Sequence, residues 1–243
     1  GFDRINSAND ITIGGTTRFI NDTTGAELMN LSLGYRYFIT PENDFLYGNQ
    51  TQDAQLFLPS PNLITELNNN WSKTISTTAS FQYDTTYSVI DAYTANIKWN
   101  PDDGKVINLG FNYQYDLPLL FYAYTPGQAF TPTSYENQYA ITVSEQWPIY
   151  ENKIYAISSA NYDFTRQMLL NVVGGAQYNG GCYTISAVYQ QYIFNYNQTQ
   201  STWMLNFNFK GIGDIGSGDP TTALGMNVPG YMPMNQIQSN QTQ

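Results

Sequence analysis

Apolar and polar side chains alternate along much of the chain. From Met29 to Ile39 every odd position is apolar or aromatic, while the even positions include Asn30, Ser32 and Arg36. Residues 202–213 repeat the pattern, with Trp203, Leu205, Phe207 and Phe209 at every second position. Successive side chains of a β-strand point to opposite faces, so each stretch predicts a strand with one apolar and one polar face. Such a strand can cross a bilayer, which takes about 9–11 tilted residues.

The same reasoning predicts eleven antiparallel strands joined by turns and loops. The expected strands are 10–20, 27–39, 62–68, 71–83, 89–99, 106–115, 139–147, 154–162, 167–178, 182–192 and 202–213. Long loops are expected at 40–61 and 116–134, and a strand hidden in 40–61 would raise the count to twelve. Tight turns that alternate with longer loops are typical of outer-membrane barrels. We therefore expect an all-β fold, an antiparallel transmembrane β-barrel segment of 11–12 strands over 1–213, followed by a tail over 214–243.

Composition supports this interpretation. The chain has 21 Tyr and 16% aromatic residues, whereas only 12% of its residues are charged, about half the share in an ordinary soluble domain. A net charge of −10 argues against nucleic acid as a partner, because nucleic-acid binders carry basic patches. No apolar run reaches the length of a transmembrane helix. The opening GFDRINSAND lacks the features of a signal peptide, so we expect a mature product or a fragment.

The chemistry available to the chain is limited. The sequence contains no His, which excludes a Ser-His-Asp triad and His-ligated zinc within it. We expect no enzymatic activity, no cofactor and no metal site. The long loops carry acidic residues such as Asp44 and Asp53, but carboxylates as scattered as these are usually solvated and do not bind a divalent cation. One cysteine, Cys182, cannot form a disulfide within the chain.

Several segments resemble the C-terminal part of the LptD family, the outer-membrane lipopolysaccharide-assembly proteins. They follow one another in the family's order and are GFDRINSANDITIGGTTRF (1–19), PDDGKVINLGFNYQY (101–115), QWP (146–148), GGAQYNGGCYTISAVYQQY (174–192), FNFKGIGDIG (207–216) and ALGMNVPGY (223–231). The resemblance implies that the chain is the C-terminal part of a larger barrel, with further strands and a periplasmic jellyroll domain encoded upstream.

The resemblance also implies a function. The family inserts lipopolysaccharide into the outer leaflet of the outer membrane of Gram-negative bacteria, through a barrel with a lateral gate between its first and last strands. The implied partners are lipopolysaccharide, an LptE-like plug lipoprotein, the periplasmic lipopolysaccharide-bridge proteins that meet the N-terminal domain, and the barrel-assembly machinery.

Individual residues acquire expected roles from the resemblance. Cys182 stands where the family has the second of two adjacent cysteines, with Gly181 in place of the first, which implies a disulfide to the upstream part; the alternative is a free thiol. Trp203, Leu205, Phe207 and Phe209 would line the gate, or simply face lipid. The residues expected to face the lumen, where they contact the plug or the substrate or merely solvate the interior, are Arg18, Asn30, Arg36, Lys98, Asn112 and Gln114.

Three other classes of protein remain open at this point. A porin or transporter barrel for small solutes shares the alternation, and a soluble β-sandwich with lectin-like binding would stay soluble without detergent. An outer-membrane protease or lipase is disfavoured by the missing His.

Overall fold

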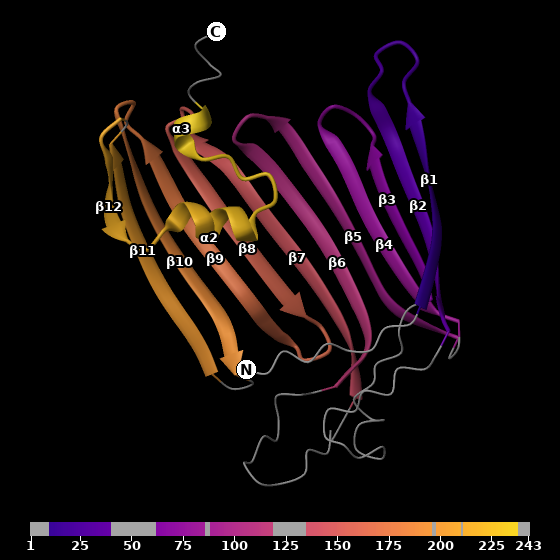
Figure 1. Cartoon of the computed structure of the whole chain (residues 1–243). Coiled ribbons are helices and arrows are strands. Elements are labelled where there is room, and N and C mark those ends of the chain that lie inside the picture. Colours follow the sequence, from indigo (N-terminus) through magenta and orange to yellow (C-terminus); the bar gives the residue numbers. More distant parts are fainter. Residues whose placement is uncertain are drawn as a thin grey trace. The chain divides into compact units, whose positions relative to one another are not determined.

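The computed structural model describes residues 10–39, 62–85, 88–118, 135–195, 198–209 and 211–237. In this part of the chain twelve strands pair in sequence order, from β1 to β12 (Figure 1). The strands are β1 (Asp10–Ile20), β2 (Glu27–Phe38), β3 (Leu63–Asn70), β4 (Ile75–Asp84), β5 (Val89–Asp102), β6 (Lys105–Pro118), β7 (Tyr135–Tyr150), β8 (Ile154–Asp163), β9 (Met168–Asn179), β10 (Tyr183–Asn195), β11 (Gln198–Phe209) and β12 (Gly213–Ser217). The helices are α2 (Pro220–Asn227) and α3 (Met234–Ile237). The expected all-β, antiparallel class is confirmed.

Contacts within the chain gather into two units. The first comprises Gly1–Asn69, Thr78–Ala95 and Asn112–Tyr139, and the second Asn70–Thr77, Asn96–Phe111 and Ala140–Gln243. Among the described residues of both, no helix is long and apolar enough to cross a membrane.

The first unit shows the alternation clearly in β1 and β2. Ile13 and Tyr37 lie on the apolar face and are largely exposed. On the other face Arg36 is opposite Thr12 and forms an ion pair with Asp10. The two faces therefore differ in polarity as the sequence predicts.

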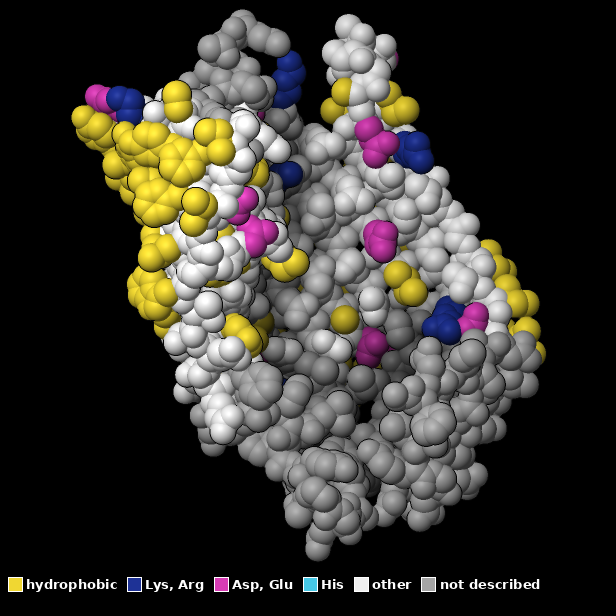
Figure 2. Space-filling view, turned by 60° about the vertical axis from the view of Figure 1, so that its left-hand side comes forward, with side chains coloured by type: hydrophobic (Ala, Val, Ile, Leu, Met, Phe, Trp, Pro, Cys, Tyr) yellow, Lys and Arg dark blue, Asp and Glu magenta, His cyan; other side chains and the backbone are white. Residues whose placement is uncertain are grey.

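In the second unit, we call the face of the sheet that carries α2 and α3 the inner face, and the opposite one the outer face. Large hydrophobic side chains of the outer face are exposed, among them Val143, Leu205, Phe207 and Ile215. Figure 2 shows hydrophobic side chains gathered over the strands that come forward in that view. This face has the character of a surface that meets lipid.

Aromatic residues mark one end of the outer face. The rings of Trp99 and Trp147 lie 5.5 Å apart, and the Lys105 ammonium lies 6.0 Å from the centre of the Trp147 ring. Trp rings with a long basic side chain beside them are typical of the boundary between lipid and water.

One turn differs from the sequence prediction. Between the expected strands 62–68 and 71–83 the sequence predicts a turn around Asn68, Asn69 and Asn70, but these residues belong to β3, and the chain turns at 71–74. The Ser72 hydroxyl accepts hydrogen bonds from the N–H groups of Thr74 at 3.2 Å and Ile75 at 3.0 Å. This local side-chain bonding fixes the turn, and it outweighs the tolerance of Asn for turn geometry.

The end of the sheet also differs. The strand expected at 202–213 runs from Gln198 to Phe209, and it is followed by a hairpin turn in which Gly211 has a φ of +80°. β12 then pairs with β11 from Phe209↔Gly213 to Leu205↔Ser217. The expected boundary between the strands (1–213) and the tail (214–243) therefore falls within β12, which belongs to the sheet. The possible strand in 40–61 lies outside the described residues.

Candidate functional site

The segment after β12 folds back over the inner face of the second unit. We call residues 218–237 the docked tail; it contains α2 and α3 and lies across β7–β10 in Figure 1. The sequence predicted a tail here but not its docking.

The start of α2 is set by local chemistry. Asp219 is the N-cap residue, and its carboxylate accepts hydrogen bonds from the N–H groups of Thr221 at 3.0 Å and Thr222 at 3.2 Å. Pro220 occupies the first turn, where its missing N–H and fixed φ suit a helix start. The hydroxyl and the N–H of Thr222 both donate to the Asp219 carboxylate and hold its pKa below the ordinary value.

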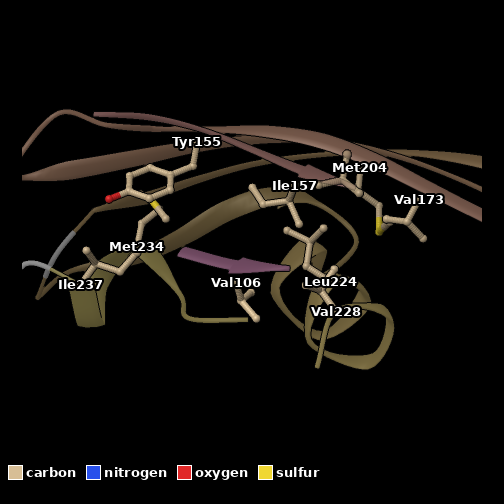
Figure 3. Packing of buried hydrophobic residues seen from close by; sticks show 10 residues of the cluster. Val106, Tyr155, Ile157, Val173, Met204, Leu224, Val228, Met234 and Ile237 are labelled. Carbon is tan, nitrogen blue, oxygen red and sulfur yellow. The ribbon is translucent and has the colours of Figure 1, made fainter. Parts of the chain in front are cut away.

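Apolar side chains join the docked tail to the sheet. Leu224 of α2 and Val228, the residue that caps the C-terminus of α2, are fully buried, and Leu224 points toward Ile157 in Figure 3. Met234 lies against the ring of Tyr155 in the same view. The cluster consists of Val106, Tyr155, Ile157, Val173, Val188, Met204, Leu224, Val228, Met234 and Ile237. Burying each large aliphatic side chain stabilises the docked tail by about 1.5–3 kcal/mol.

Strand register explains why the sheet offers an apolar patch there. Ile157 is opposite Gly175, Gly175 is opposite Val188, and Val188 is opposite Met204, so these residues form one row across β8–β11. A Cβ on Gly175 would lie 2.8 Å from Cγ2 of Val188, so only glycine fits at that point of the row. The inner face is therefore apolar beneath α2, although a barrel lumen is polar as a rule.

The backbone of the docked tail is held by amide side chains of the sheet. Gln146 is fully buried, accepts a hydrogen bond from the Met232 N–H at 2.9 Å and donates one to the Met232 carbonyl at 2.8 Å. The Asn108 amide donates to the Pro229 carbonyl at 3.0 Å. Two side chains thus satisfy three backbone groups of a segment that has no strand partner there.

Tyr231 connects the docked tail to a polar part of the inner face. Its hydroxyl donates to Gln177 Oε1 at 3.0 Å, and the Gln177 amide donates to the Ser186 hydroxyl at 3.0 Å. Burial raises the pKa of Tyr231 to about 12, so the phenol is neutral at physiological pH. Asn171 and Asn227 make a further side-chain hydrogen bond at the other end of α2.

The end of the docked tail covers the β5–β6 turn. Gly104 has a φ of +73°, and a Cβ on it would lie 2.6 Å from Cδ1 of Ile237. Glycine is required there both for the backbone conformation and for the close approach of the tail.

A polar cavity of about 390 Å³ lies between the docked tail and β9–β12. Two polar rows of the sheet form its floor: Gln177, Ser186 and Asn206 in one, and Thr184, Asn208 and Asp214 in the other. Tyr231, Asp219 and Thr221 of the docked tail border it.

The terminal-strand residues lie together on the outer face. Trp203, Leu205, Phe207 and Phe209 are all exposed, and the Trp203 ring lies 4.9 Å from that of Tyr189. β11 pairs with β10 from Phe209 to Gln198, whereas β12 covers its other edge only from Leu205 to Phe209. Within the described residues, the remainder of that edge has no strand beside it.

The residues expected to face a lumen are distributed over both units. In the first unit Arg36 pairs with Asp10, Arg18 lies 3.8 Å from Glu27, and Arg18 is opposite Asn30. Asn112 and Gln114 lie at even positions of β6, as Asn108 does, and therefore on the same face of that strand. In the second unit, Lys98 borders the docked tail: a Cβ on Gly230 would lie 3.6 Å from Lys98 Cδ.

Cys182 is exposed in the turn between β9 and β10. A disulfide to another part of a longer protein stays a prediction, because the chain contains one cysteine. Among the described residues, no group of three or more potential metal ligands comes together.

The sequence analysis does not single out the residues that hold the docked tail, which are Asn108, Gln146, Gln177, Leu224, Val228 and Tyr231. Two signals were present. Asp219-Pro220 is a helix start, and Val173, Val188 and Met204 place apolar side chains on the face that alternation assigns to the polar side.

Comparison with known proteins gives one consistent result. The family model for LptD, described as LPS transport system D, matches residues 1–153. The LPS-assembly protein LptD of Chromobacterium violaceum is 27% identical over 97% of this chain and 28% of its own length. That of Thiobacillus denitrificans is 27% identical over 98% of this chain and 29% of its own length. That of Burkholderia cenocepacia is 29% identical over 96% of this chain and 28% of its own length. The chain spans less than a third of the length of these relatives.

Proposed function

The chain belongs to the LptD family, and we propose that it forms part of the outer-membrane wall through which lipopolysaccharide is inserted into the outer leaflet. The observation that carries the proposal is the two-faced sheet of the family-matched chain: hydrophobic side chains on the outer face, and amide and hydroxyl groups on the inner face. Such strands satisfy their backbone groups within the sheet and present apolar side chains to lipid, as spanning a bilayer requires.

We propose that the work of the chain is mechanical and involves no covalent chemistry. β11 and β12 would border the lateral gate. The support for this is the uneven pairing of β11, since β12 accompanies only the stretch from Leu205 to Phe209. An edge that is paired over part of its length opens at a lower free-energy cost than a fully paired one.

The partners follow from the same proposal. Lipopolysaccharide is the substrate, an LptE-like lipoprotein would sit inside the barrel, and periplasmic bridge proteins would deliver the substrate through the N-terminal part. The barrel-assembly machinery would insert the protein. Cys182, exposed on a short turn, would form a disulfide with that N-terminal part in the oxidising periplasm.

Depletion of the full-length protein in its own cells tests the proposal. We expect lipopolysaccharide that is accessible to antibody at the cell surface to fall, and to recover when the wild-type protein is expressed again. Unchanged surface lipopolysaccharide after complete depletion would overturn the proposal. The porin alternative predicts instead that the purified full-length protein conducts small solutes across a planar bilayer.

A further inference from the structure

The polar cavity beside the docked tail carries an inference about its ligand. At about 390 Å³ it falls within the range of about 300–1,000 Å³ for small-molecule sites. Both the sheet and the docked tail contribute to it, so the cavity exists only when the tail is docked.

Two polar side chains that line the cavity have no hydrogen-bond partner among the described residues. Within the described residues, the Asn208 amide and the Thr221 hydroxyl make no side-chain hydrogen bond, and both line the cavity. Asn206 donates to Asp214 at 3.2 Å, which leaves its amide oxygen and the second Asp214 oxygen as acceptors. Donors and acceptors therefore converge on one space, a combination that suits hydroxyl groups because each hydroxyl both donates and accepts.

The charges of the cavity lining restrict the class of ligand that can bind. Asp214 and Asp219 line the cavity, and its lining in the described part of the chain contains neither Lys nor Arg. A phosphate or carboxylate ligand would meet two negative charges and no positive one, so it is repelled.

The docked tail contributes apolar side chains to the lining of the cavity. Pro233 and Met234 line it together with Tyr231, whose hydroxyl is already engaged by Gln177. A sugar ring has C–H groups on its faces and hydroxyls at its edges, and it fits a space with one apolar side and several convergent polar groups.

We propose that this cavity is a subsite for neutral sugar residues and excludes phosphorylated ones. The inference rests on the proposed function for its source of sugar, since lipopolysaccharide carries both kinds of residue past the inner face. A free neutral oligosaccharide would present the same chemistry.

Saturation-transfer NMR on the purified full-length protein in detergent tests the subsite with maltotriose and with glucose 6-phosphate as probes. We expect saturation transfer to maltotriose and none to glucose 6-phosphate. Asn208→Leu and Thr221→Val each remove one unpartnered group, and each should weaken maltotriose binding by roughly fivefold or more. Thr199→Val, on the outer face at the opposite end of β11, is the matched control and should bind as the wild type does.

Absence of maltotriose binding, or equal binding of both probes, would overturn the inference. So would unchanged affinity in both cavity variants. A photo-crosslinking residue at position 208 in cells separates the two sources, because lipopolysaccharide in the adduct identifies it as the ligand and a lipid-free sugar adduct identifies an oligosaccharide. The depletion experiment does not depend on this result, so the proposed function and the subsite can fail separately.

Discussion

Replacing Leu224 with Ala should release the docked tail from the inner face. The Leu224 side chain has no exposed surface and packs in the cluster that joins α2 to the sheet. Leu→Ala changes at buried sites cost about 2–5 kcal/mol, because apolar burial is lost and a cavity remains. If docking and release equilibrate quickly, the fraction of molecules with a released tail rises roughly 30- to 4,000-fold.

Chymotrypsin cleavage after Tyr231 measures this release. Tyr231 is partly buried and its backbone is held against the sheet while the tail is docked, so cleavage reports the population of the released form when reclosing outpaces cutting. Mass spectrometry of the peptide that begins at Met232 separates this cut from others in the purified full-length protein. We expect its rate of appearance to rise by the factor given above.

Met226→Ala is the matched control. Met226 belongs to the same helix and is 80% exposed, so its truncation should leave the cleavage rate within about twofold of the wild type. Equal rates in the two variants, with barrel levels unchanged, would refute the idea that the apolar cluster holds the tail.

Other predictions address the remaining contacts. Gln146→Leu removes both hydrogen bonds to the tail backbone, which should cost about 2 kcal/mol and raise the same cleavage rate roughly 30-fold. The lowered pKa of Asp219 means that its helix cap stabilises α2 above the ordinary carboxyl pKa and is lost as pH falls through the lower folded-state value. A fluorophore on the tail should therefore report release in acid, and Asp219→Asn should remove this pH dependence. Phe207→Asp places a charge on the lipid-facing side of β11 and should reduce barrel levels in the outer membrane, whereas Thr202→Asp on the other face should not. If Cys182 forms the proposed disulfide, Cys182→Ser should remove one fast-migrating species of the full-length protein on a non-reducing gel.

The alternation of side chains was sufficient to predict most strands. β1 has the expected bounds, and β2 differs by one residue at its end. These strands have one apolar and one polar face, so period-two alternation is strong. In β8 both Ile157 on the inner face and its neighbour Ala156 on the outer face are apolar. Where the docked tail makes the inner face apolar as well, the strand loses the alternation that would tell its faces apart.

The sequence pattern contains the start of α2 and an apolar patch on the polar face, but it does not predict that the tail docks there. α2 has eight residues, of which only Pro220 and Leu224 are buried, and two positions are too few to establish a helical period. Its stability comes from residues far away in the sequence, such as Gln146 and Asn108. The polar cavity forms only when the tail docks, so no local sequence pattern predicts it.

The sequence separation of the tail contacts has a consequence for how the protein folds. Each strand pairs with the next, so the sheet can grow by adding one hairpin at a time. The docked tail instead bonds to residues 86 and 121 positions earlier, and it needs β6 to β11 to be side by side first. Tail docking therefore follows the pairing of these strands, and protection of Tyr231 from protease would report in cells that they have been assembled.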